Sequence, residues 1–160
     1  MKLCVIEGDG IGQEVIPVAV KILQAMFPSL EIIQAQAGWE FFQQHGVPLT
    51  DETLALVREC GALLYGAATT PSYPVERYYS PIVRLRRETN TYANIRPISY
   101  LPVPAAREGV DLIVVRENTE DVYVSDEQSS PGGEQGTAKK VITRAASERV
   151  AQMAFHMAKL

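Results

Sequence analysis

The sequence predicts a mixed α/β fold built on a parallel sheet. Apolar runs at 3–6 and 62–65 and an alternating apolar–polar segment at 31–37 have the composition of strands, and segments with helical periodicity separate them. A glycine-rich turn directly after the first run completes a strand–turn–helix unit, which typically opens a parallel α/β sheet. Such sheets bind ligands at the carboxyl ends of their strands, so the loops after these strands are candidate sites.

Composition and charge exclude several classes of function. The 160 residues are 46% hydrophobic and 21% charged, which suits one folded domain or parts of two. A formal net charge of -4 provides no basic field for nucleic acid. No apolar run is long enough to cross a bilayer and we find no targeting segment, so we expect a cytoplasmic protein that binds neither nucleic acid nor membrane. Cys4 and Cys60 adjoin apolar residues, which favours reduced, buried thiols over a disulfide or a metal pair.

The glycine-rich turn at 7–12 has the sequence Glu-Gly-Asp-Gly-Ile-Gly and precedes a helical segment that reaches Phe27. Pro17 fits poorly inside a helix, so we expect the regular helix to begin near it. The turn resembles a dinucleotide-binding loop but lacks the third glycine of that fingerprint, because Gln13 follows Gly12. A tight turn that needs positive backbone angles explains it equally well.

Two further features are expected to build the core of the first half. Thr50 is a good helix cap, and the helix that it begins should end near Gly61, with two acidic residues in its first turn. The preceding segment carries an aromatic cluster that we interpret as core packing rather than a ligand platform: Trp39, Phe41 and Phe42.

The loop at 66–71 follows a predicted buried strand and therefore lies at the ligand edge of the sheet. Thr69 and Thr70 are candidate hydroxyl ligands there, although a plain turn also explains them. Ser80 and Pro81 then form a cap followed by proline at the first helical position.

Three arginines and a tyrosine in one short part of the chain suggest a site for a small molecule with several carboxylates: Arg86, Arg96, Arg116 and Tyr123. A guanidinium carries a fixed charge and a planar fork of donors that matches a carboxylate, and a held tyrosine can transfer a proton. Unrelated surface cations are the alternative interpretation. Arg84 lies roughly 200° around its helix from Arg86, so these two cannot easily serve one site.

The last part of the chain predicts a strand pair and a helix. An apolar strand at 111–115 ends at Arg116, and we expect further strands at 122–125 and 140–144 around a polar, mobile hairpin loop. A two-stranded arm of this kind is unstable alone and often packs on a second subunit. Ser147 is expected to cap the last helix.

These motifs, in this order, resemble the β-decarboxylating hydroxyacid dehydrogenases, the family of isocitrate, isopropylmalate, homoisocitrate and tartrate dehydrogenases. The resemblance covers essentially the whole chain and rests on EGDGIG, LRR, YANIRP, VRENTE and the tyrosine that follows. It implies an α/β fold of the isopropylmalate dehydrogenase-like α/β/α sandwich type, incomplete in this chain. Residues 1–98 would belong to the first domain and 99–160 would start the second, with a dimerisation arm around 122–145.

The family pattern places its LR pair ten positions before the arginine of the RP segment, which selects Arg86 to act with Arg96. Arg84 and Arg87 are then interpreted as solvated charges. The resemblance implies that three arginines clamp the substrate and that a tyrosine delivers a proton to the enol carbon: Arg86, Arg96, Arg116 and Tyr123. It also implies NAD as cofactor, next to Ile11, Thr69 and Thr70, and Mg or Mn held by residues outside this segment.

The segment before Arg86 bears on the choice of substrate. Ser80 matches the serine that isocitrate-type enzymes use for the distal carboxylate, whereas Ile82 replaces their asparagine. We therefore expect homoisocitrate, converted to 2-oxoadipate in lysine biosynthesis, ahead of isocitrate and isopropylmalate, and a homodimeric enzyme. The catalytic lysine and metal-binding aspartates of the family have no counterpart here, so the 160 residues alone should be inactive. The alternative is a short, non-catalytic homologue that binds a polycarboxylate or regulates a complete subunit.

Overall fold

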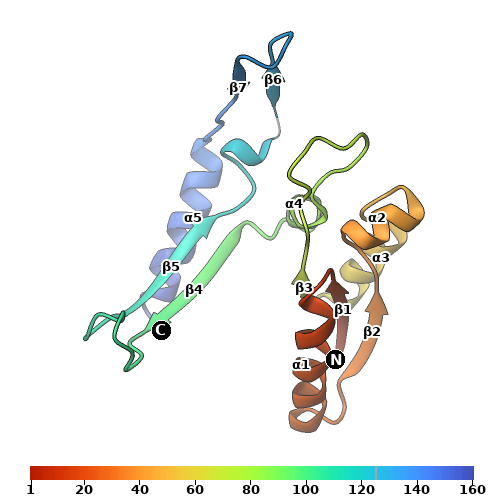
Figure 1. The fold of residues 1–160 in the computed structure, drawn as a ribbon. Coiled ribbons are helices and arrows are strands. Elements are labelled where there is room, and N and C mark those ends of the chain that lie inside the picture. Colours follow the sequence, from red (N-terminus) through yellow and green to blue (C-terminus); the bar gives the residue numbers. More distant parts are fainter. Residues whose placement is uncertain (125) are drawn as a thin grey trace. The chain divides into compact units, whose positions relative to one another are not determined.

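The computed structural model describes residues 1–124 and 126–160, and the chain divides into two compact units, Met1–Thr89 and Asn90–Leu160. The domain boundary predicted after residue 98 falls inside a strand, β4 (Ala93–Ser99), which begins the second unit and pairs entirely within it (Figure 1). The assignment of 1–98 and 99–160 to two domains stays a prediction.

The first unit contains a parallel three-stranded sheet in the order β2-β1-β3. The strands are β1 (Lys2–Gly8), β2 (Glu31–Ala35) and β3 (Leu63–Ala67). Four helices accompany them: α1 (Gly12–Met26), α2 (Trp39–His45), α3 (Asp51–Cys60) and α4 (Pro81–Glu88). The predicted α/β class is therefore confirmed, and the strand expected at 31–37 ends two residues earlier.

The core of this unit lies on both faces of β1, because successive side chains of a strand point to opposite sides. Cys4 and Ile6 are fully buried on one face, in a cluster that includes Leu54 of α3 and Leu85 of α4. Val5 is fully buried on the other face, against Ile16 and Val20 of α1. The helices thus cover the sheet from two sides (Figure 1).

Helix α1 begins at Gly12, so the start expected near Pro17 is wrong. Pro17 lies inside the helix, where it removes one backbone bond, to the carbonyl of Gln13. That carbonyl belongs to the first turn, which limits the disruption to the helix end. The aromatic segment forms α2, whose rings are half-buried rather than core: Trp39 stacks on Phe42 with ring centroids 5.5 Å apart.

The predicted caps of α3 and α4 are confirmed. The Thr50 side chain accepts a hydrogen bond from the Thr53 N–H, and the Ser80 side chain accepts one from the Val83 N–H. Arg84 is not the solvated charge that the sequence suggested. Its guanidinium donates to the carbonyl of Leu49, to the Tyr79 hydroxyl and to Asp51. It thereby fastens α4 to the loop before α3 and is committed to structure.

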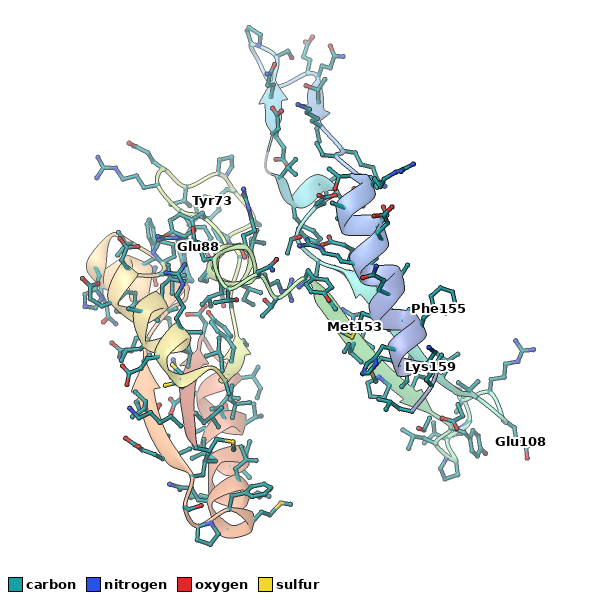
Figure 2. The ribbon with its side chains drawn as sticks, turned by 180° about the vertical axis from the view of Figure 1, so that it is seen from behind. Tyr73, Glu88, Glu108, Met153, Phe155 and Lys159 are labelled. Carbon is teal, nitrogen blue, oxygen red and sulfur yellow. The ribbon has the colours of Figure 1, made fainter. Side chains whose placement is uncertain are left out.

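The second unit is built on two antiparallel strands, β4 and β5 (Asp111–Glu117), which confirms the apolar strand expected at 111–115. Helix α5 (Arg144–Met157) packs on β5. Its half-buried Met153 points toward the strands and Phe155, 72% exposed, points away from them (Figure 2). Thr143, rather than the expected Ser147, caps this helix, because its side chain accepts the Ala146 N–H.

The arm differs from its prediction in detail. Val122–Val124 form a 3-10 helix instead of a strand, and Ser125 lies outside the described residues. The strands of the hairpin are β6 (Glu127–Ser129) and β7 (Gly136–Ala138), inside the segment expected to be loop. Asp121 adopts a φ of 69° and bridges to Val141, and this turn directly precedes the 3-10 helix at Val122–Val124.

Helix α1 carries a second apolar stripe on its outer side. Five residues at helical spacing are between 49% and 65% exposed: Ile11 just before the helix, then Val15, Val18, Ile22 and Met26. A surface helix normally has one apolar face. Helix α1 is therefore apolar on two faces, and only the one that contacts β1 is covered within its unit.

Candidate functional site

The turn after β1 is packed tightly against the end of β3, at the carboxyl edge of the sheet. The Asp9 N–H donates to the carbonyl of Ala67 over 2.9 Å. A Cβ added to Gly8 would lie 1.9 Å from the Ala67 carbonyl oxygen, and one added to Gly12 would lie 2.0 Å from that of Glu7. Gly8 also has a φ of 75°. Close backbone approach thus requires glycine at both positions, and Gly8 also needs its positive angle.

Asp9 is the most connected residue of this edge, and sequence reasoning passed over it. Its side chain is buried, and its carboxylate accepts three backbone N–H bonds, from Trp39, Glu40 and Thr69, at 2.9, 2.9 and 2.7 Å. The signal that could have found it is an acidic residue inside a glycine turn that directly follows a buried strand.

Thr69 and Thr70, the predicted cofactor contacts, are exposed at the end of β3. The Thr69 carbonyl accepts a hydrogen bond of 2.7 Å from the Tyr78 hydroxyl. Burial and the nearby charge of Asp9 raise the pKa of Tyr78, so this phenol is a neutral donor at physiological pH. The same two causes raise the pKa of the more deeply placed Tyr65.

Ile11, the third predicted cofactor contact, is 59% exposed in the turn itself. Beside the turn, a groove of about 770 Å³ is lined by polar side chains that include Gln13, Gln36 and Glu40. Glu40 accepts from the Gln13 side chain at 2.7 Å and from the Gly10 N–H at 3.3 Å. Carboxylates and amides such as these can bind ligand hydroxyl groups. Ile11 follows β1, and Thr69 and Thr70 follow the neighbouring strand β3. All three predicted cofactor contacts therefore lie at the carboxyl edge of the sheet.

In the same unit, Ser80 caps α4 and Arg86 lies within that helix. The Ser80 hydroxyl accepts the Val83 N–H over 3.4 Å, so its own hydrogen is not used in that bond. Arg86 is half-buried near the end of the helix. Arg84 is occupied by Tyr79 and Asp51, and the choice of Arg86 as the ligand-binding arginine of this helix stays a prediction.

Arg96 and Arg116 share one face of the β4–β5 pair. Asn94 and Arg96 are two residues apart on β4, and Arg116 of β5 pairs with Asn94, so alternation places all three side chains on one side. The Arg96 side chain donates to Asn94 over 3.0 Å. Glu117 points to the other face, where Arg149 of α5 binds it, so the arginines lie on the face away from α5.

Tyr123 lies against Arg116. The Arg116 guanidinium donates a hydrogen bond to the phenolic oxygen and lies 5.8 Å from the centre of the ring. The structure thus brings the predicted proton donor to one of the predicted clamp arginines. Arg96 shares their unit and Arg86 belongs to the other unit. The convergence of Arg86 with these residues stays a prediction.

The segment that carries Arg116 is fixed by a network that the sequence did not reveal. The Glu117 carboxylate accepts from the Thr119 N–H and hydroxyl, from the Glu120 N–H and from Arg149, at 2.6–2.9 Å. Burial alone would raise the pKa of Glu117, but these hydrogen bonds outweigh it and the pKa is lowered. The next residue, Asn118, is 6% exposed and donates to the Thr91 carbonyl.

No group of three or more His, Cys, Asp or Glu side chains arranged to hold a metal occurs within residues 1–124 and 126–160. In the same residues, no helix is long and apolar enough to cross a membrane.

Known dehydrogenases resemble this chain in sequence and in structure. The isocitrate/homoisocitrate dehydrogenase of Thermus thermophilus is 45% identical over 157 residues, which cover 98% of this chain and 46% of that enzyme. The 3-isopropylmalate dehydrogenase of Methanothermobacter thermautotrophicus is 46% identical over 159 residues, covering 99% and 46%. The crystal structure of isocitrate dehydrogenase from Methylococcus capsulatus matches with a TM-score of 0.89 and 36% identity, over 99% of this chain and 47% of that one.

The fold and the site define an α/β protein with a glycine turn at the carboxyl edge of its sheet. In its second unit, a strand arginine is paired with a tyrosine from the following 3-10 helix. The isocitrate/isopropylmalate dehydrogenase family matches residues 2–160, and the chain belongs to it. The family resemblance and the fold class are therefore confirmed. The chain spans about half the length of the relatives, which are dehydrogenases named for different substrates.

Proposed function

We propose that this protein takes part in the NAD-dependent oxidative decarboxylation of a malate-type 2-hydroxy acid. The pairing of Arg116 with Tyr123 is the observation that carries the proposal. It joins a fixed positive charge, suited to a carboxylate, to a phenol suited to proton transfer. Arg96 lies on the same strand face as Arg116 and adds a second charge. We extend the clamp to Arg86 on the strength of the family resemblance.

Homoisocitrate is the substrate that we propose first, with isocitrate second and isopropylmalate third. Ser80 supports an acid with a distal carboxylate, because its hydroxyl accepts the Val83 N–H and can still donate. Ile82, half-buried in the first turn of α4, is an apolar residue where isocitrate-type enzymes carry asparagine. This combination favours a longer spacer between the carboxylates.

The residues of the chain divide the chemistry between them. Bound NAD would accept the hydride from the 2-hydroxyl carbon. Thr69 and Thr70, exposed at the end of β3, and Ile11, exposed in the glycine turn, suit contact with its nicotinamide end. The arginines would hold the carboxylates, and Tyr123 would return a proton to carbon after carbon dioxide leaves. Because its oxygen accepts from Arg116, the phenolic hydrogen is not used in that bond.

Mg or Mn is also proposed, on family resemblance alone. The described residues do not supply a fitting set of ligands for the ion. We also propose a homodimer in which residues around 122–145 form the contact arm, and a cytoplasmic location.

The experiment is an assay of the gene product at its native length with NAD, Mg or Mn, and a panel of malate-type acids. We expect formation of NADH and carbon dioxide, fastest with homoisocitrate. Isopropylmalate oxidised far faster than homoisocitrate would reverse the ranking. The second candidate is a polycarboxylate-binding homologue without catalysis, in which Arg96 and Arg116, on one strand face, would hold the acid without any hydride transfer. Calorimetric binding of the acids without any NADH formation would support it.

A further inference from the structure

The three bonds to Asp9 connect loops that follow all three strands of the sheet. Asp9 itself follows β1, Trp39 and Glu40 begin α2 after β2, and Thr69 follows β3. Both oxygens are used: Oδ2 accepts from Trp39 and Thr69, and Oδ1 accepts from Glu40. Asp9 thus holds the end of β3 to the start of α2 through one buried carboxylate.

The surroundings of this carboxylate are closely packed. Gly38 precedes α2 with a φ of 136°, and a Cβ added to it would lie 2.5 Å from Asp9 Oδ1. At 2% exposure, Asp9 is closed off from solvent. Hydrogen bonds from N–H groups to an ionised acceptor are among the stronger ones in proteins, and three of them fix the orientation of the carboxylate.

Thr69 is held from its other side as well. Its carbonyl accepts the Tyr78 hydroxyl at 2.7 Å, and the Tyr78 ring packs edge-on against Trp39 and Phe42, with centroids 5.2 Å apart in both cases. The N–H of Thr69 is therefore bound to Asp9 and its carbonyl to Tyr78. Both partners are themselves anchored on α2.

We propose that Asp9 and Tyr78 are positioning residues that set the Thr69–Thr70 backbone for dinucleotide binding. This inference rests on the proposed function, in which these threonines contact the cofactor. Their own side chains are exposed, so nothing else that the structure describes orients them as directly as the two bonds to the Thr69 peptide groups. Neither positioning residue needs to touch the cofactor.

Two conservative variants of the gene product test the inference. Asp9→Asn keeps the shape but presents an amide N–H₂ to N–H donors, and Tyr78→Phe removes only the hydroxyl. We expect Asp9→Asn to raise the KM for NAD by roughly tenfold and Tyr78→Phe by roughly fivefold. In both, the KM for the hydroxy acid should change less than twofold. Hydrogen exchange of the Thr69 amide in the unliganded protein should accelerate in Asp9→Asn.

Matched controls are available in exposed positions. Asp111→Asn repeats the same chemistry at the start of β5, and Tyr73→Phe repeats the hydroxyl deletion within the β3–α4 loop (Figure 2). Both should leave the KM for NAD and the Thr69 amide unchanged. Tyr78→Phe keeps its ring packing, so it provides the answer even if Asp9→Asn does not fold.

The outcomes separate this inference from the proposed function. An unchanged KM for NAD in both variants, or an equal rise in the KM for the acid, would overturn the inference while leaving the proposed function in place. A wild-type protein that neither binds nor reduces NAD would overturn the proposed function and the inference with it.

Discussion

Arg116 and Tyr123 are joined by a hydrogen bond from the guanidinium to the phenolic oxygen, seven positions apart in the sequence. The bond crosses a sharp turn at Asp121, which has a φ of 69°. On the adjacent strand, Asn94 lies opposite Arg116 and receives the Arg96 side chain. Two arginines on the strand pair and a phenol from the 3-10 helix that follows it are therefore arranged within one unit.

Arg116→Ala should reduce kcat/KM for the preferred acid by an amount equivalent to about 2–5 kcal/mol, because a substrate carboxylate would be left without its charged partner. Arg116→Lys should recover only part of this loss, since a single ammonium cannot reproduce the planar fork. Steady-state kinetics provide the measurement. Arg107→Lys, in an exposed loop, is the control, and an equal loss in that variant would remove the special role of Arg116.

Tyr123→Phe should lower kcat by roughly 10²- to 10⁴-fold, the usual contribution of a positioned proton donor. The KM for the acid should change little, because the arginines that hold the carboxylates remain. Rates of NADH and carbon dioxide formation should be measured separately. Tyr100→Phe, at a 44% exposed tyrosine, is the matched control. A fully active Tyr123→Phe enzyme would exclude the tyrosine as the proton donor.

Thr50→Ala should reduce the free energy of unfolding by about 1 kcal/mol, because the Thr53 N–H at the start of α3 loses its acceptor. Urea denaturation followed by circular dichroism measures the change. Thr50→Ser retains a hydroxyl and should stay within a few tenths of wild type. An equal loss in both variants would attribute the effect to the methyl group rather than to the cap.

Glu117→Gln should make the free energy of unfolding depend less steeply on pH in the acid range. The folded-state pKa of Glu117 lies below the ordinary value of 4.5, so its ionised form stabilises the fold above that pH. The stabilisation is lost as the pH falls below 4.5 and through the folded-state pKa. Denaturation at a series of pH values from neutral downward should show a shallower fall in the variant. Glu134→Gln, exposed in the hairpin, should keep the wild-type slope.

The two thiols should differ in reactivity. Cys4 is fully buried, and burial, together with the proximity of Cys60, raises its pKa to about 11, so it stays protonated at pH 8. A thiol reagent should label the half-buried Cys60 in the native protein and reach Cys4 only after unfolding. Cys60→Ser should therefore remove native labelling. Rapid labelling of Cys4 in that variant would contradict the buried position.

Local chemistry explains why much of the fold could be predicted. Thr50 and Ser80 could be predicted as helix caps because each cap is one hydrogen bond between residues three positions apart, from a first-turn N–H to a side-chain oxygen. The helix start predicted near Pro17 was wrong because the proline removes only one backbone hydrogen bond, close to the helix end, and the helix tolerates this loss. The prediction for the arm was wrong at 122–124 because the turn at Asp121, which the bridge to Val141 accompanies, leads into a 3-10 helix there.

The candidate site was predictable where residues interact directly with a ligand and hidden where they hold other residues. Arg116 and Tyr123 carry recognisable chemistry in their side chains. Asp9 and Arg149 act through partners 30 or more positions away, and no pattern within the chain reveals such pairings. Arg84 was misjudged for the same reason, since its partner Asp51 is 33 positions distant.

The outer stripe of α1 has a practical consequence for handling these 160 residues on their own. Ile22 and Met26 are more than half exposed to water, and Val18 lies one turn away. An exposed apolar stripe of this kind promotes self-association. The isolated polypeptide should therefore bind hydrophobic fluorescent dyes, and its light scattering should increase with concentration. Replacing Val18 and Ile22 with lysine would keep the helix, leave the side facing β1 untouched and improve solubility.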